Sequence, residues 1–290
     1  MHYRSNNIMT FVPPNEEGKL ILQHALFFQK TLGMRVFVCC INEKPTLLEK
    51  LFNPQKGHDL NNLTVEKLHE LSESALPADA LDHIAYRVKS GKLIPLLLRQ
   101  SKKGGYEFII VDKSESETSL KPDELNKLIS HSFCPIMAIN KNYPLKKIKK
   151  IVIPVDVTQT TKKKLLWATY FAKKYSAKII IISALTLNLK AKRSLGWRNA
   201  EKLRRLLSQR GVDCDLQIIN APGQEKHKVI LGYIREEKPD MVIIRTHQES
   251  NRKNTQIGKF VSELIHGCKI PVFTVNSFIP AISDDFVLRL

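Results

Sequence analysis

The sequence predicts an α/β protein built from two tandem, doubly wound parallel sheets. The first observation is the stretch Ile151–Ile182, where an apolar strand, an amphipathic helix and a β-branched strand follow one another as a βαβ unit. The second is that this stretch matches residues 8–39 when it is shifted by 143 positions. The third is that strand and helix patterns alternate through both halves, which is typical of helices covering both faces of a parallel sheet.

The internal repeat indicates a duplicated domain, because each period is long enough to form its own core. Lys19, Leu22 and Phe28 fall on Lys162, Leu165 and Phe171, and residues 134–140 parallel residues 270–276. We therefore expect a first domain at residues 1–143, a second at 144–276 and a tail at 277–290. The tail carries enough apolar residues that we expect it to dock on the body or on a partner subunit.

Each half contains five predicted strands and four predicted helices. In the first half, the strands span 8–12, 35–41, 82–89, 106–111 and 135–140, and the helices 18–32, 64–76, 93–102 and 122–130. Residues 42–62 are polar, with Pro45, Pro54 and Gly57, and we interpret them as a loop with a short apolar turn at Leu47–Phe52. Pro122 fits the first turn of its helix, where the missing N–H costs little.

The second half repeats this order. Its first helix follows Asp156, and its later helices span about 197–210, 225–238 and 258–266. Gly211 is a good C-cap for the helix that ends at Arg210. The strands span 151–155, 179–182, 212–218, 241–244 and 271–275.

Charge is distributed unevenly between the halves. The formal net charge is +18, and residues 146–290 hold 28 Lys and Arg against 12 Asp and Glu, whereas residues 1–145 hold 18 against 16. The basic half suggests an anionic partner, which would be a nucleotide, a nucleic acid or an anionic lipid; the alternative is a lysine-rich solvated surface.

Several other classes of function lack support. The five cysteines are odd in number and have no CxxC spacing, so we interpret them as reduced, buried thiols of a cytoplasmic protein, with no zinc site. No apolar run is long enough to span a bilayer. The Gly-Lys pairs do not form a P-loop, no hydrolase, metalloprotease or kinase motif is present, and no nucleic-acid-binding motif appears. We therefore expect a non-catalytic protein without a metal.

Two motifs at the predicted strand ends resemble the universal stress protein family in its tandem two-domain form. Ile153-Pro154-Val155-Asp156 resembles the family's strand-one pattern V-P-V-D, and residues 240–247 resemble its strand-four pattern D-x-I-V-x-G-T-H. Proline also opens the last strand of each half. The resemblance implies sheets with strand order 3-2-1-4-5, and it implies dimers formed through the last strands, a pairing that tandem members can make within one chain.

The resemblance also implies a site for ATP, built from the strand-one aspartate and the motif G-x2-G-x9-G-[ST]. Glycines let backbone N–H groups approach phosphates closely. Here the second half keeps the spacing, but Arg245, Gln248 and Lys259 replace two glycines and the Ser/Thr. Our candidate ligand-binding residues are Asp156, Arg245, Thr246, His247, Gly258 and Lys259. The first half has Pro13 in place of Asp156 and a shorter loop without glycine at 112–121, so we expect no ATP site there.

These features predict a cytoplasmic, non-catalytic stress-response or regulatory protein. Three alternatives are open for the second half: loss of the site, a remodelled site for an anion such as ATP or another adenine nucleotide, or ordinary ATP binding. Electrostatic binding of nucleic acid by the basic half is a separate alternative. Expected partners are the other domain or a second copy of the chain, together with an unidentified protein, and we expect no association with membranes.

Overall fold

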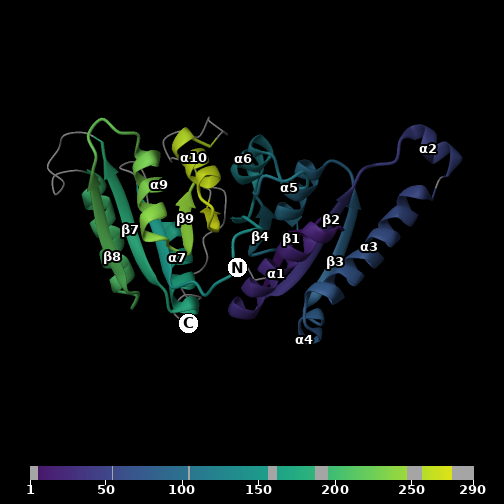
Figure 1. Cartoon of the computed structure of the whole chain (residues 1–290), viewed down its shortest axis with the longest axis horizontal. Coiled ribbons are helices and arrows are strands. Elements are labelled where there is room, and N and C mark those ends of the chain that lie inside the picture. The colour runs from purple at the N-terminus through teal and green to yellow at the C-terminus, as the bar shows by residue number, and fades with distance from the viewer. Residues whose placement is uncertain are drawn as a thin grey trace. The chain divides into compact units, whose positions relative to one another are not determined.

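The structure is a computed structural model of the chain (Figure 1). It describes residues 6–53, 55–103, 105–155, 162–186, 195–246 and 257–275. The chain divides into two compact units, residues 1–145 and 146–290, which we call the first and second domains. The predicted tail, residues 277–290, lies outside the described residues.

The first domain contains a parallel sheet with the order β3-β2-β1-β4-β5. In chain order, its strands are β1 (Asn7–Phe11), β2 (Arg35–Asn42), β3 (Ile84–Ser90), β4 (Phe108–Asp112) and β5 (Ile136–Ile139). β1 pairs with both β2 and β4, so the strand order reverses beside β1. Every residue of β4 and β5 is buried, as expected for central strands covered on both faces.

Six helices of the first domain are described: α1 (Glu16–Leu32), α2 (Leu47–Phe52), α3 (Lys56–Ala75), α4 (Ala78–Leu81), α5 (Leu93–Lys103) and α6 (Pro122–His131). Right-handed crossovers place α1 and α3 on one face of the sheet and α5 and α6 on the other. Consistently, α1 packs against α3, and α5 packs against α6.

The second domain has the same strand order, with β8-β7-β6-β9-β10 in place of β3-β2-β1-β4-β5. Its strands are β6 (Lys150–Pro154), β7 (Lys178–Leu185), β8 (Cys214–Asn220), β9 (Met241–Arg245) and β10 (Val272–Val275). The described helices are α7 (Lys162–Tyr175), α8 (Leu195–Ser208), α9 (Lys226–Glu237) and α10 (Lys259–Gly267). The predicted doubly wound fold and its strand order are confirmed.

Each domain has its own aromatic core beneath its first helix. In the first domain, the rings of Phe28 and Phe108 meet edge to face with centroids 6.3 Å apart. In the second, Trp167 and Phe171 on α7 each lie 4.8 Å from Phe273 on β10. The aromatic residues predicted for the first helix of the repeat therefore anchor it to the sheet.

The predicted loop at 42–62 is wrong over most of its length. α3 begins at Lys56, eight residues before the predicted start at Thr64, and α2 forms a separate short helix. Leu60 continues the apolar stripe of Leu68 and Leu71 by two turns toward the start of α3. Because Leu60 is 38% exposed, it adds little buried apolar surface there, and the first turns of α3 have a weak hydrophobic pattern. Thr46 caps α2 through a capping box with Glu49, a local signal that Pro45 and Pro54 obscured.

All five cysteines are free and buried, as predicted. Burial raises the pKa of the Cys39 and Cys134 thiols to about 12, so both are held as unreactive thiols. Among the described residues, no helix is long and apolar enough to cross a membrane. No cluster of potential metal ligands occurs in the same part of the chain.

Candidate functional site

In both domains, the candidate site lies at the carboxyl ends of the strands, beside the point where the strand order reverses. Parallel pairing places the ends of β1, β4 and β5 at one edge of the first sheet, and the ends of β6, β9 and β10 at one edge of the second. Ligands of doubly wound proteins bind at this edge. The two domains fill this edge differently.

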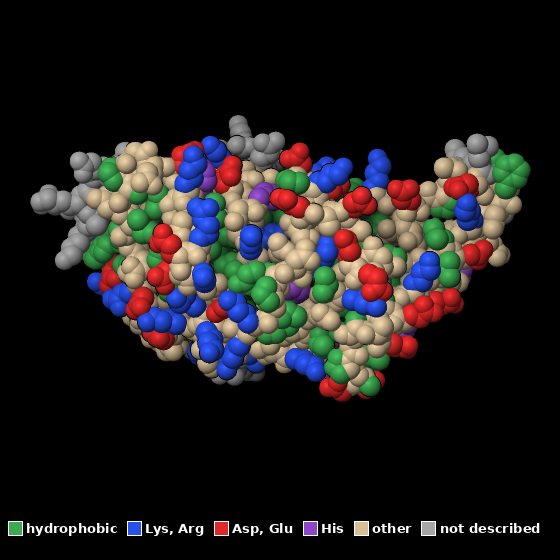
Figure 2. All heavy atoms as spheres, viewed as in Figure 1, with side chains coloured by type: hydrophobic (Ala, Val, Ile, Leu, Met, Phe, Trp, Pro, Cys, Tyr) green, Lys and Arg blue, Asp and Glu red, His purple; other side chains and the backbone are tan. Residues whose placement is uncertain are grey.

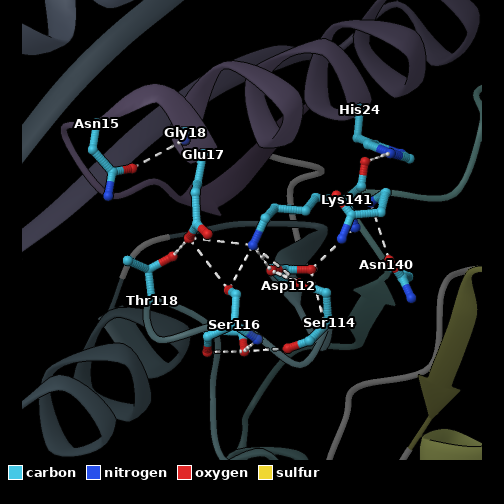
Figure 3. Close-up of polar contacts among 12 residues, drawn as sticks. Asn15, Glu17, Gly18, His24, Asp112, Ser114, Ser116, Thr118, Asn140 and Lys141 are labelled. Carbon is cyan, nitrogen blue, oxygen red and sulfur yellow. Dashed lines mark hydrogen bonds and ion pairs between the residues drawn. The ribbon is translucent and has the colours of Figure 1, made fainter.

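A buried lysine occupies this edge of the first domain (Figure 3). Lys141 follows β5, and its side chain is only 3% exposed. Its Nζ lies 3.2 Å from Asp112 Oδ2, and it donates hydrogen bonds to Ser114 Oγ at 3.1 Å and Ser116 Oγ at 2.6 Å. Glu17 Oε2 lies 3.3 Å from the same nitrogen. Four oxygen atoms therefore surround one ammonium group.

The carboxylate of Asp112 is fixed by several donors besides that ammonium. Its Oδ1 accepts from the backbone N–H of Lys141 at 3.1 Å and of Ser114 at 3.0 Å, and its Oδ2 accepts from Ser114 Oγ at 2.6 Å. Asp112 is itself only 3% exposed. A buried carboxylate is stable only with this degree of pairing and hydrogen bonding.

The first turn of α1 closes the network from the side of β1. Glu17 accepts hydrogen bonds from Thr118 and Ser116 in the loop that follows β4. The hydrogen bond from Thr118, assisted by Lys141 and Ser116, lowers the pKa of the Glu17 carboxyl. Glu17 is therefore ionised at neutral pH, and the group of Glu17, Asp112 and Lys141 carries one net negative charge.

Gly18 and His24 hold α1 close to this network. Asn15 caps α1 by accepting from the Gly18 N–H at 3.3 Å, and a Cβ atom at Gly18 would lie only 2.2 Å from the carbonyl oxygen of Pro13. Further along the helix, buried His24 donates from Nε2 to the carbonyl oxygen of Lys141 at 3.3 Å. The backbone and the side chain of Lys141 are thus both fixed against α1.

In the second domain, the described part of the carboxyl edge of the sheet includes a buried cationic residue. Arg245 is the last residue of β9 and is only 6% exposed. The next residue, Thr246, is 4% exposed, and its N–H donates to the carbonyl oxygen of Val275 at the end of β10. Two of the predicted ligand-binding residues therefore lie side by side at the predicted edge.

Gly258 and Lys259 begin α10, where Gly258 is the N-cap residue. The Lys259 ammonium lies 2.9 Å from Glu225 Oε1, and its side chain is 70% exposed. The hydrogen bond to Glu225 raises the pKa of Lys259. Lysines 228 and 259 lower the pKa of the Glu225 carboxyl to about 2, with Lys228 the larger cause. Lys259 therefore shares the single carboxylate of Glu225 with Lys228 at the start of α9.

Asp156 and His247 were also predicted for this site, but both lie outside the described residues. The network around Lys141 was not predicted from the sequence. A signal was nevertheless present in the sequence. When the ends of β4 and β9, the fourth strands of the two domains, are aligned, the charged residues Asp112 and Arg245 fall on the same position. Two charged residues at the end of a central strand are unusual, since such positions are normally apolar.

Comparison with known proteins supports the predicted family. The model of the universal stress protein family matches residues 147–276. No curated protein sequence matches this chain significantly.

Similar structures extend over both domains. A universal stress protein from Archaeoglobus fulgidus aligns with a TM-score of 0.71 at 14% identity, covering 94% of this chain and 99% of that one. A protein of unknown function from Pseudomonas aeruginosa aligns with a TM-score of 0.62 at 17% identity, covering 98% and 95%. The cytoplasmic domain of a prokaryotic cation chloride cotransporter aligns with a TM-score of 0.53 at 10% identity, covering 96% and 98%.

At these identities, the structural matches establish the fold, and the family model identifies the second half. The second domain of this chain therefore belongs to the universal stress protein family, and the chain as a whole has the fold of a two-domain member of that family.

Proposed function

We propose that this protein is a non-catalytic regulator of the stress response, in which only the second domain binds an anionic ligand. The ligand class that we propose is an adenine nucleotide such as ATP, held at the carboxyl ends of β6 and β9. The observation that carries the proposal is a difference in charge at one strand position, where the first domain has Asp112 and the second has Arg245.

The first domain is unsuited to phosphate for two reasons. The space at its strand ends is taken by the side chains of Lys141, Ser114 and Ser116, which hydrogen-bond to one another. The two carboxylates of Glu17 and Asp112 outnumber the single ammonium of Lys141, so an incoming phosphate would meet net negative charge in a partly buried region of low dielectric constant. We infer that this domain is structural or binds a protein partner.

The second domain offers the opposite charge at the corresponding place. A guanidinium has five N–H donors in a planar fork that matches phosphate geometry, and it remains charged at any physiological pH. Arg245 can therefore replace the backbone donors that the glycines of the family motif supply. Thr246 adds a hydroxyl next to it, and Asp156, directly after Val155 at the end of β6, is our candidate for orienting the ribose or balancing Arg245.

Lys259 has a smaller part in this proposal than the sequence motif suggested. Its ammonium is engaged by Glu225, and its exposure leaves it well solvated. We therefore propose that Arg245 supplies the main positive charge for the ligand and that Lys259 contributes at most long-range attraction.

The experiment is thermal unfolding of the full chain with millimolar ATP, ADP and AMP, followed by titration calorimetry with any nucleotide that raises the melting temperature. A ligand at a hundred times its dissociation constant stabilises the binding state by about 2.7 kcal/mol. We expect the shift to be lost in Arg245→Met and Asp156→Asn, and to persist in Lys259→Met. Arg245→Lys keeps the charge without the planar fork, and we expect it to retain weak binding.

The absence of a shift with every nucleotide would overturn the proposal and would favour a scaffold that has lost its site. Loss of binding in Lys259→Met but not in Arg245→Met would contradict the role given to Arg245. Circular dichroism of each variant without nucleotide separates loss of binding from loss of folding.

A further inference from the structure

A stripe of cations runs along the exposed face of α8 in the second domain. Arg198, Lys202 and Arg205 follow one another at spacings of four and three residues, so they share one face of the helix, and all three are exposed. The opposite face of α8, with Ala200, Leu203 and Leu207, is fully buried against the sheet. Figure 2 shows that Lys and Arg side chains are numerous on the visible surface of the second domain.

The stripe borders an open hollow of about 390 Å³ that also has apolar walls. Its lining includes Trp197 and Leu206, both half-buried, together with the three cations. A surface that combines an aromatic side chain, a leucine and three cations fits a segment that is both apolar and acidic, because such a segment satisfies the two kinds of group at once.

The acidic residue within α8 does not neutralise this stripe. Glu201 accepts two hydrogen bonds from Arg204, each 2.8 Å long, and one of 3.0 Å from Arg205. These arginines, Arg204 foremost, lower the pKa of Glu201 to about 2, so Glu201 is ionised at neutral pH and its charge is shared between two cations. Within the described part of the chain, Arg198 and Lys202 have no acidic side chain at ion-pair distance.

The chain itself contains a segment of matching chemistry. Residues 277–290, SFIPAISDDFVLRL, place Asp284 and Asp285 between the apolar residues Ile282 and Phe286. Only 12 acidic residues occur in the whole second half, so two adjacent ones within an apolar segment are a distinctive match to a basic, partly apolar groove.

The segment is also long enough to reach the groove. β10 ends at Val275, at the carboxyl edge of the sheet, and α8 begins at the same edge because it follows β7. α8 packs against β7 and β8. The farther of these two strands, β8, is four strand spacings away from β10, or about 19 Å. The nine residues from Val275 to Asp284 span up to ~30 Å when extended.

We propose that residues 277–290 dock on α8 of the same chain, with Asp284 and Asp285 against Arg198 and Lys202, and with the neighbouring apolar residues covering Trp197 and Leu206. The docked tail shields the α8 stripe from other polyanions. This inference is independent of the nucleotide site.

The test uses the full chain and a carbodiimide, which joins a carboxylate directly to an amine in contact with it. We expect mass spectrometry to find Lys202 joined to Asp284 or Asp285. In a mixture of 14N- and 15N-labelled protein, the product should contain one isotope only. Crosslinks that join the two isotopes would show that a second copy of the chain fills the groove, and would overturn the proposal, as would the absence of the crosslink.

Binding of a single-stranded 30-mer oligonucleotide gives a second readout that does not depend on crosslinking. Asp284→Lys/Asp285→Lys should bind it more tightly than the wild type, by about fivefold for each ion pair released. Glu70→Lys/Glu73→Lys, on exposed positions of α3, makes the same change in net charge and serves as the control. Equal binding by the wild type and both variants would show that the stripe is already open, and would overturn the docking of the tail.

Discussion

Asp112 and Arg245 occupy the same position in the two domains. Each is the last residue of the fourth strand of its sheet, and each pairs in register with the last residue of the fifth strand, Ile139 or Val275. One domain has an anion there and the other a cation. Because the surrounding strands match in order and register, the difference in charge is local to the carboxyl edge.

We predict that Lys141→Met strongly destabilises the protein. The substitution keeps much of the volume of the side chain but leaves the buried carboxylate of Asp112 without its ammonium, which costs about 3–5 kcal/mol. Chemical denaturation monitored by circular dichroism measures the change. In Lys141→Met/Asp112→Leu, which removes both charges, we expect most of the stability to return; no recovery would mean that the network does more than balance its own charge.

Lys141→Ala offers a complementary test of the same network. The truncated side chain leaves a polar space shaped for an alkylammonium, so n-propylammonium should raise the melting temperature of this variant. The same concentration of tetramethylammonium, which cannot donate hydrogen bonds, is the control. Equal effects of both salts would exclude specific binding at the vacated position.

Gly18→Ala should destabilise the first domain, although alanine favours helices. The new Cβ would lie 2.2 Å from the carbonyl oxygen of Pro13 and 2.9 Å from both Val12 and Leu71, so backbone and core must shift, at a cost of about 1–3 kcal/mol. Gly232→Ala in α9 is the matched control, since a Cβ there meets no atom within 4 Å. We expect the control to gain about 0.5–1 kcal/mol from helix propensity. A neutral Gly18→Ala would contradict the close packing of α1.

Stability should fall as the pH drops below about 6.5, and His24 should contribute to this loss. Burial lowers the pKa of His24 below its ordinary value of 6.5, with the carbonyl of Lys141 and the charge of Asp112 opposing the shift. The unfolded chain therefore binds a proton that the folded chain excludes, which favours unfolding at lower pH. Glu17, whose pKa is lowered, loses its stabilising contribution only at more acidic pH, below its ordinary value of 4.5.

Denaturation at pH 8, 7, 6 and 5 should show a smaller pH dependence in His24→Gln than in the wild type. His83→Gln, at an exposed position, should follow the wild-type curve. Parallel curves for His24→Gln and the wild type would show that His24 takes up its proton equally in the folded and unfolded states.

Phe52 and Phe28 should differ sharply when replaced. Phe52 at the end of α2 is 90% exposed, whereas Phe28 is 1% exposed in the core of the first domain. We expect Phe52→Ala to change the free energy of unfolding by less than about 0.5 kcal/mol and Phe28→Ala to reduce it by about 3–5 kcal/mol. A large cost for Phe52→Ala would indicate that this ring is buried in solution against another surface.

Most of the fold could be predicted because it rests on patterns within single elements. The β-branched run at Ile179–Ile182 and the aromatic face of α7 each identify their element without reference to the rest of the chain. α3 was predicted too short, because its first turns have polar residues, Gly57 and a single apolar contact position at Leu60. Helix boundaries of this kind depend on caps and neighbours more than on periodicity.

The candidate sites were less predictable for a physical reason. A motif such as that of residues 245–259 specifies the backbone geometry of a single loop. Its spacing can therefore be recognised in the sequence alone. The network around Lys141 joins Glu17, Asp112 and Lys141 from three separate strand ends, so only the folded sheet brings them together. The same holds for Lys259, whose partner Glu225 is 34 positions away along the chain.

In the first domain, the ammonium group that pairs with the buried carboxylate of Asp112 belongs to the same chain, so this position is always occupied. The ammonium of Lys141 cannot dissociate from the protein, so its presence beside Asp112 does not depend on the concentration of any metabolite. The stability of the first domain therefore does not depend on the concentration of a ligand at this edge, whereas that of a domain with a dissociable ligand follows the ligand's concentration by mass action. In such a pair, one half serves as the fixed reference against which a change in the other can be measured.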